Sequence, residues 1–124
     1  MITSNQIQSA GKILLEGSGI LRNENIENIS YFSAFQGISE VILTDKRSYT
    51  LNMTMAELEN NLPLMFFFRC SRSHIINLLN INKVLFNHES SILMDCGAQI
   101  KLSRRRKEGL SLAMKNLSLI YTNN

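Results

Sequence analysis

The 124-residue sequence lacks the features that define disulfide-rich, membrane-spanning and secreted proteins. It has two cysteines, Cys70 and Cys96, which fits a reducing compartment and a thiol packed in a core better than a structural disulfide. The densest apolar run, Leu62 to Phe68, is far shorter than the ~18 residues of a membrane helix. Residues 1–6 lack the basic-then-apolar pattern of a signal peptide. We therefore expect a soluble, cytoplasmic chain that makes no contact with a membrane.

The composition is that of a globular protein. Hydrophobic residues make up 44% of the chain and charged residues 19%, which excludes a disordered chain. The length predicts one domain with a substantial core, and we find no repeat or linker. We expect an N-terminal arm at 1–11, one domain at 12–117 and a C-terminal tail at 118–124.

The charge is unevenly distributed, although the formal total is only +3. Residues 69–107 contain eight basic and two acidic residues, whereas the remainder contains five basic and eight acidic residues. A chain polarised in this way attracts a polyanion to one side, and nucleic acid is the commonest polyanion in the cytoplasm. A solvated basic face without a partner is the alternative that charge alone leaves open.

Alternating apolar and polar residues predict a mainly β domain. The expected strands lie within the first 30 residues and at 31–32, 40–44, 49–53, 67–70, 75–76, 84–86, 92–94 and 99–102. Polar or glycine-containing segments separate them, including an expected loop from Phe35 to Ser39.

Two segments have helical spacing instead. Thr54 and Glu57 form a capping-box pattern that predicts a short helix ending at Pro63. Ser103 is followed by apolar residues at 110, 113, 114 and 117, which predicts an amphipathic C-terminal helix with Ser103 as its N-cap.

Four consecutive cations, at residues 104–107, fall in the expected first turn of that C-terminal helix. The helix dipole is positive there, so each cation is disfavoured by roughly 0.3 to 1 kcal/mol. This arrangement suggests an external anion, and a helix start with the Ser103 hydroxyl suits a phosphate. Arginine can also donate two hydrogen bonds to guanine in the major groove. The alternative is a solvated helix cap.

A second basic cluster spans residues 69–74 and mixes guanidinium groups with hydroxyls. Such side chains suit phosphate oxygens, and Arg72 could reach a base edge. Other roles remain open for its neighbours: Cys70 could pack in the core, Ser73 could bond the backbone of the turn, and Arg69 could be a snorkelling edge residue.

Signals for catalysis and metal binding are weak. Cys70, His74, His88 and Cys96 resemble a zinc set, but if residues 70–74 are extended, the Cα atoms of the first pair lie about 13 Å apart, too far for one ion. No oriented cysteine–histidine pair and no glycine-rich phosphate loop is recognisable. We expect no enzyme activity, no metal and no cofactor.

Several motifs occur together in a fixed order. They are YFSA at 31–34, a hairpin reaching 53, MAEL and LP within 55–63, FRCSRSHIIN at 68–77, and IKLSRR at 100–105. Together they resemble the LytTR family of bacterial DNA-binding domains over roughly residues 12–117. The most specific blocks are Arg72, Ser73 and Asn77 in one segment and Ser103 to Arg105 in the other.

The resemblance implies an elongated fold of antiparallel sheets with one short middle helix and a C-terminal helix. It also implies that loops, and not a recognition helix, enter successive major grooves on one face of the DNA. The loop at 35–39 enters the expected interface on this resemblance alone. The predicted DNA-contacting residues are Gln36, Ser39, Arg69, Ser71, Arg72, Ser73, Lys101, Ser103, Arg104, Arg105, Arg106 and Lys107.

The leading hypothesis is therefore a sequence-specific transcription regulator that binds double-stranded DNA. Two half-sites about one helical turn apart would let two copies, as a homodimer on DNA, bind one face of the duplex. The alternative is a protein-interaction module whose basic face docks an acidic partner. RNA binding is less favoured, because no strand carries a pair of aromatics of the RNP type.

Overall fold

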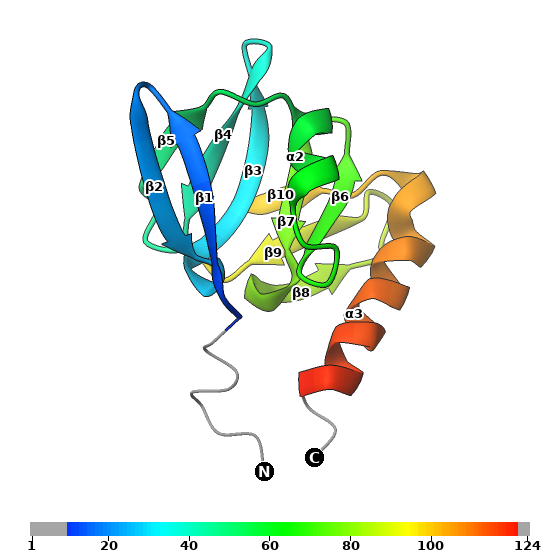
Figure 1. The fold of residues 1–124 in the computed structure, drawn as a ribbon. Helices are drawn as coiled ribbons and strands as arrows, with labels where there is room; N and C mark the ends of the chain where they lie inside the picture. Colours follow the sequence, from blue (N-terminus) through cyan, green and yellow to red (C-terminus); the bar gives the residue numbers. More distant parts are fainter. Residues whose placement is uncertain (1–9, 122–124) are drawn as a thin grey trace.

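The computed structural model describes residues 10–121, with side chains to residue 118. The predicted arm at 1–11 and tail at 118–124 lie largely outside this range, although the last helix continues to Tyr121. The described residues form three antiparallel sheets and two α-helices, as Figure 1 shows. The mainly β fold with a short middle helix and a C-terminal helix is thus confirmed.

The central sheet has five strands in the order β5-β4-β3-β7-β6. Its strands are β3 (Ile29–Phe35), β4 (Ile38–Leu43), β5 (Ser48–Leu51), β6 (Phe67–Ser71) and β7 (His74–Asn77). The expected loop at 35–39 is only a two-residue turn, because β3 continues to Phe35 and β4 begins at Ile38. Figure 1 shows this hairpin, in cyan, projecting beyond the rest of the domain.

A two-stranded sheet lies beside the central one. It consists of β1 (Lys12–Gly17) and β2 (Ile20–Asn25), and the amide of Asn52 donates to the Glu16 carbonyl at 2.9 Å. Gly17 is required there, because a Cβ atom would overlap the Thr50 carbonyl. This contact fixes the hairpin across the end of β5.

The third sheet has the order β10-β9-β8. Its strands are β8 (Ile81–Leu85), β9 (Ser91–Met94) and β10 (Gln99–Lys101). Two 3-10 turns, η1 (Ile26–Asn28) and η2 (Leu78–Asn80), precede β3 and β8. The apolar segment at 84–86 predicts this strand, but β8 begins three residues earlier, at Ile81.

Helix α2 (Met55–Asn61) begins with the predicted capping box. The Glu57 amide donates to the Thr54 hydroxyl at 3.2 Å, and the Thr54 amide donates to the Glu57 carboxylate at 3.0 Å. Met55 and Leu58 are buried, so the helix packs one face on the domain. The hydrogen bond from the Thr54 amide holds the pKa of the Glu57 carboxyl below its usual range.

The C-terminal helix begins later than the sequence predicts. α3 spans Lys107–Tyr121, and a 3-10 turn, η3 (Arg104–Arg106), precedes it with Ser103 at its N-cap. The Ser103 side chain makes no capping hydrogen bond. The prediction that Ser103 caps an α-helix whose first turn holds the arginines is therefore wrong in detail.

Asn77, the last residue of β7, connects that strand to the segment that leads into β3. It is fully buried, its side-chain amide donates to the carbonyls of Ile26 and Ile29 at 2.8 Å each, and its side-chain oxygen accepts from the Leu79 amide at 3.0 Å. Burial of an amide is tolerated because its hydrogen bonds are satisfied. The motif residue Asn77 therefore has a structural role.

We expect Asn77→Ala to lower the free energy of unfolding by about 2 to 3 kcal/mol, because it leaves buried polar groups without partners. Urea denaturation measures the loss. The exposed Asn82 provides the control, since Asn82→Ala should cost less than about 0.5 kcal/mol. Equal stabilities of the two variants would contradict this role for Asn77.

Candidate nucleic-acid interface

Three segments that the sequence predicts to contact DNA lie next to one another. They are the β3–β4 turn (Gln36–Gly37), the β6–β7 turn (Arg72–Ser73) and the segment 103–107. The Ala34 amide donates to the Ser73 carbonyl at 2.9 Å, and the Ser103 amide donates to the Cys70 carbonyl at 3.1 Å. The β6–β7 hairpin is therefore hydrogen-bonded to the strand that carries the first turn and to the start of the third segment. We call these three segments the basic face.

The β3–β4 turn is a tight two-residue turn whose residues are exposed. Gln36 (φ 48°) and Gly37 (φ 83°) both have positive φ, as two-residue hairpin turns of this handedness require. Gln36 is exposed. Ser39, by contrast, is fully buried, and its hydroxyl donates to the Met53 carbonyl at 2.7 Å. Since its side chain supports the hairpin from inside, we leave Ser39 out of the basic face.

The β6–β7 turn presents Arg72 and Ser73 to solvent. Ser71 is half-buried, and its hydroxyl accepts from the Ser73 amide at 3.2 Å. His74 packs its ring against Tyr31, with 6.1 Å between centroids, and burial lowers the pKa of the His74 imidazole. The local positive charge at neutral pH therefore comes from Arg72 and not from His74.

Arg69 differs from the other predicted contacts. Its side chain is only 15% exposed and forms an ion pair with Glu59 at 2.9 Å. The same guanidinium donates to the carbonyls of Ser71 and Arg72 at 2.8 and 2.7 Å. Arg69 thus contacts the turn from behind, while Arg72 is at its exposed tip.

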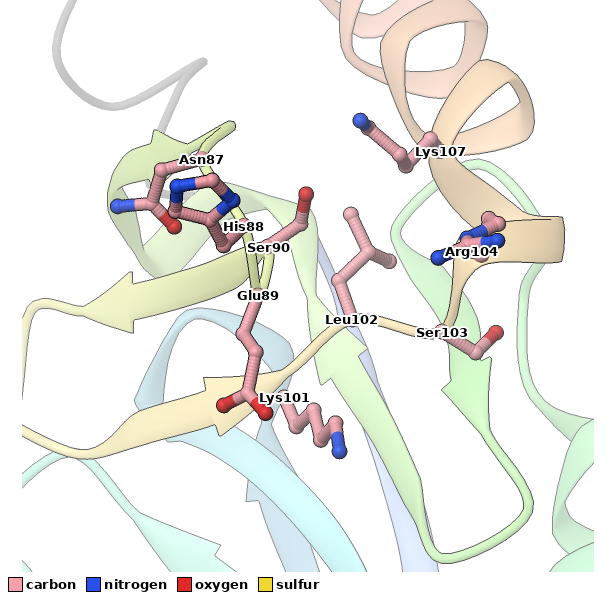
Figure 2. A pocket seen from close by; sticks show the side chains of 9 residues that line it. All are labelled: Asn87, His88, Glu89, Ser90, Lys101, Leu102, Ser103, Arg104 and Lys107. Atoms are coloured by element: carbon pink, nitrogen blue, oxygen red, sulfur yellow. The ribbon is translucent and has the colours of Figure 1, made fainter.

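The third segment forms one side of a cavity of about 440 Å³. Figure 2 shows Arg104 and Lys107 on one side of Leu102, and Asn87, His88 and Ser90 of the β8–β9 loop on the other. Ser103 and Lys101 also line the cavity, together with the carboxylate of Glu89. Lys107 lies with its ammonium 5.4 Å from the centre of the Phe86 ring. A cavity lined by three cations, one carboxylate and two serine hydroxyls has an excess of positive charge, which suits an anionic group.

The cations of the basic face have no carboxylate partner among the described residues. The ion pairs found in that part of the chain are Arg47 with Asp45 and Arg69 with Glu59. The unpaired cations of the face are Arg72, Arg104, Arg105, Arg106 and Lys107, and Lys101, which borders the face in the cavity, is unpaired as well. Their charge is available for an external polyanion.

The comparisons with known proteins identify the fold and the family. The sequence profile of the family described as "LytTr DNA-binding domain" matches residues 21–115. A solved LytTr DNA-binding domain from a Bacillus cereus protein has a TM-score of 0.70 and 21% identity, and the match covers 83% of this chain and 95% of that one.

Two longer proteins are also similar. Sensory transduction protein LytT of Bacillus cereus and its counterpart in Bacillus anthracis are each 32% identical over 82 residues. The match covers 64% of this chain. It spans 33% of each relative, about a third of their length. Within the described residues, no helix is long and apolar enough to cross a bilayer.

The β6–β7 hairpin corrects one premise of the sequence analysis. Residues 70–74 are not extended, because the chain reverses at Arg72–Ser73, and the Cys70 thiol lies 3.5 Å from the His74 carbonyl. The described residues contain no group of three or more potential metal ligands. Burial raises the pKa of the Cys70 thiol to about 12, so the thiolate is strongly disfavoured.

We expect the two cysteines to differ sharply in reactivity. At pH 8 a thiol–disulfide exchange reagent should label half-buried Cys96 in the native protein, and Cys70 on the order of 100-fold more slowly, because the thiolate is the nucleophile. Mass spectrometry of quenched samples distinguishes the sites, and Cys96→Ser should abolish the fast labelling. Labelling of both cysteines at one rate would contradict the burial of Cys70.

Proposed function

This chain belongs to the LytTR family of DNA-binding domains, and on that premise we propose that it reads double-stranded DNA as the recognition module of a transcription regulator. The observation that carries the proposal is the alignment of three segments by two backbone hydrogen bonds, with unpaired cations on two of them. An extended duplex matches such a row of segments. An acidic protein could use the same cations, but nothing in the arrangement favours it.

We assign different roles to the residues of the basic face. Arg72 and Arg105 are exposed and have the planar fork that pairs with guanine in the major groove, so we propose them as base-reading residues. Lys101, Ser103, Arg104 and Lys107 surround one cavity, which we propose holds a backbone phosphate. Phosphate contacts position the protein, and base contacts specify the sequence.

The remaining predicted contacts complete this interface. Gln36 reaches the duplex from the β3–β4 turn, Ser71 and Ser73 contribute polar groups around Arg72, and Arg106 adds charge beside the phosphate cavity. Two copies on adjacent half-sites would occupy one face of the duplex, about 34 Å apart, one helical turn.

The salt dependence of the affinity tests whether the basic face binds DNA phosphates. Six unpaired cations that each neutralise about one phosphate predict that log affinity falls against log salt concentration with a slope near −5 on duplex DNA. Fluorescence anisotropy with a labelled duplex between about 50 and 200 mM salt measures this slope. A shallow slope with every duplex tried would contradict DNA binding through the basic face.

Substitutions distinguish the residues that contact bases from those that contact phosphates. With a duplex selected from a random pool, Arg72→Ala and Arg105→Ala should each reduce the preference over a scrambled duplex by about 1 to 3 kcal/mol. Lys107→Ala should weaken both duplexes alike and reduce the salt slope by about one. If all three variants lose only salt-sensitive affinity for any sequence, the base-reading role of these arginines is wrong.

A further inference from the structure

The β6–β7 turn is held in place by a side chain that does not belong to the turn. The guanidinium of Arg69 uses three nitrogens: Nε donates to the Ser71 carbonyl at 2.8 Å, Nη2 to the Arg72 carbonyl at 2.7 Å, and Nη1 to a Glu59 carboxylate oxygen at 2.9 Å. One planar group therefore connects the carbonyls of Ser71 and Arg72 to helix α2. We call this arrangement the Arg69 brace.

The strand pairing explains why the turn needs the brace. The register of β6 with β7 shifts between Arg69 and Ser71, so that Arg69 pairs with Ile75 and Ser71 with His74. A bulge of this kind interrupts the ladder and leaves the extra residue unpaired. The guanidinium supplies hydrogen bonds to the backbone directly beyond that irregularity, in the segment that carries Arg72.

Glu59 fixes the other end of the brace. It lies on α2, whose residues Met55 and Leu58 are buried, and its side chain is 40% exposed against 15% for Arg69. The carboxylate accepts from Nη1 alone, but it is carried by a packed helix, so this charge-assisted hydrogen bond limits where the guanidinium can lie. The position of α2 is thereby transmitted to the backbone of the β6–β7 turn.

We propose that Arg69 and Glu59 are positioning residues for sequence readout by Arg72, and that Arg69 itself contacts no DNA. The inference rests on the proposed function, since it concerns the turn through which the duplex is read. It replaces the direct contact that the sequence suggested for Arg69. All three nitrogens donate to protein oxygens and the side chain is only 15% exposed, so little of the guanidinium is open to a phosphate.

The experiment compares Glu59→Ala and Arg69→Met with the wild-type protein on the selected and scrambled duplexes, over a salt series. We expect each variant to lose about tenfold of its preference for the selected duplex, within the range that one lost base contact gives. The salt slope should stay unchanged in both. Arg47→Lys, which alters the exposed Arg47–Asp45 pair elsewhere on the surface, is the matched control and should change neither quantity.

A double variant shows whether the effect acts through Arg72. In an Arg72→Ala background, Glu59→Ala should cause no further loss of preference, because the side chain that the brace positions is gone. An equal additional loss in that background would overturn the proposal, since general destabilisation would act in both. Circular dichroism melting establishes that every variant is folded at the assay temperature.

The competing role for Arg69 gives opposite results. If Arg69 contacts phosphate, Arg69→Met reduces the salt slope by about one, and that result overturns the brace. Failure of the proposed function is distinguishable, because the wild-type protein would then show no salt-dependent binding to any duplex.

Discussion

The interface depends on how the β6–β7 hairpin is attached on both sides. Ser73 accepts a hydrogen bond from Ala34 of β3, and Cys70 accepts one from Ser103 before η3. Because both bonds involve backbone groups, they set the spacing of the three segments independently of side-chain motion. The buried amide of Asn77 fixes the other end of β7 against Ile26 and Ile29. A strand anchored in this way holds the exposed β6–β7 turn in place.

The electrostatics of the interface follow from where acidic partners are placed. Arg69 is paired with Glu59 and Arg47 with Asp45, whereas the cations from Arg104 to Lys107 have no such partner among the described residues. Arg104–Arg106 form a 3-10 turn ahead of α3, so their charges lie before the positive end of the helix dipole and add to it. Cations at this position are unfavourable for the helix, and their combined field attracts anions.

Sequence patterns predicted the structure that depends on neighbouring residues. They did not predict the features that depend on contacts between distant parts of the chain. The capping box of Thr54 and Glu57 and the strand predicted at 49–53 depend on neighbours in sequence. The capping box was confirmed, and the strand was confirmed as far as Leu51. The burial of Ser39 depends on Met53, fourteen residues later, in the segment between β5 and α2. Arg69 was expected at the DNA because a cation beside hydroxyls suits phosphate. Only the fold reveals that Glu59, ten residues earlier, is its partner.

The most direct test of the basic face is to map duplex binding on the protein by amide chemical shifts. With the selected duplex, the account predicts that the largest changes fall at residues 36–37, 71–73 and 103–107. The β1–β2 hairpin, which packs against β5 and carries none of the three segments, should change little. Changes concentrated on β1–β2, with the three segments unaffected, would contradict the account.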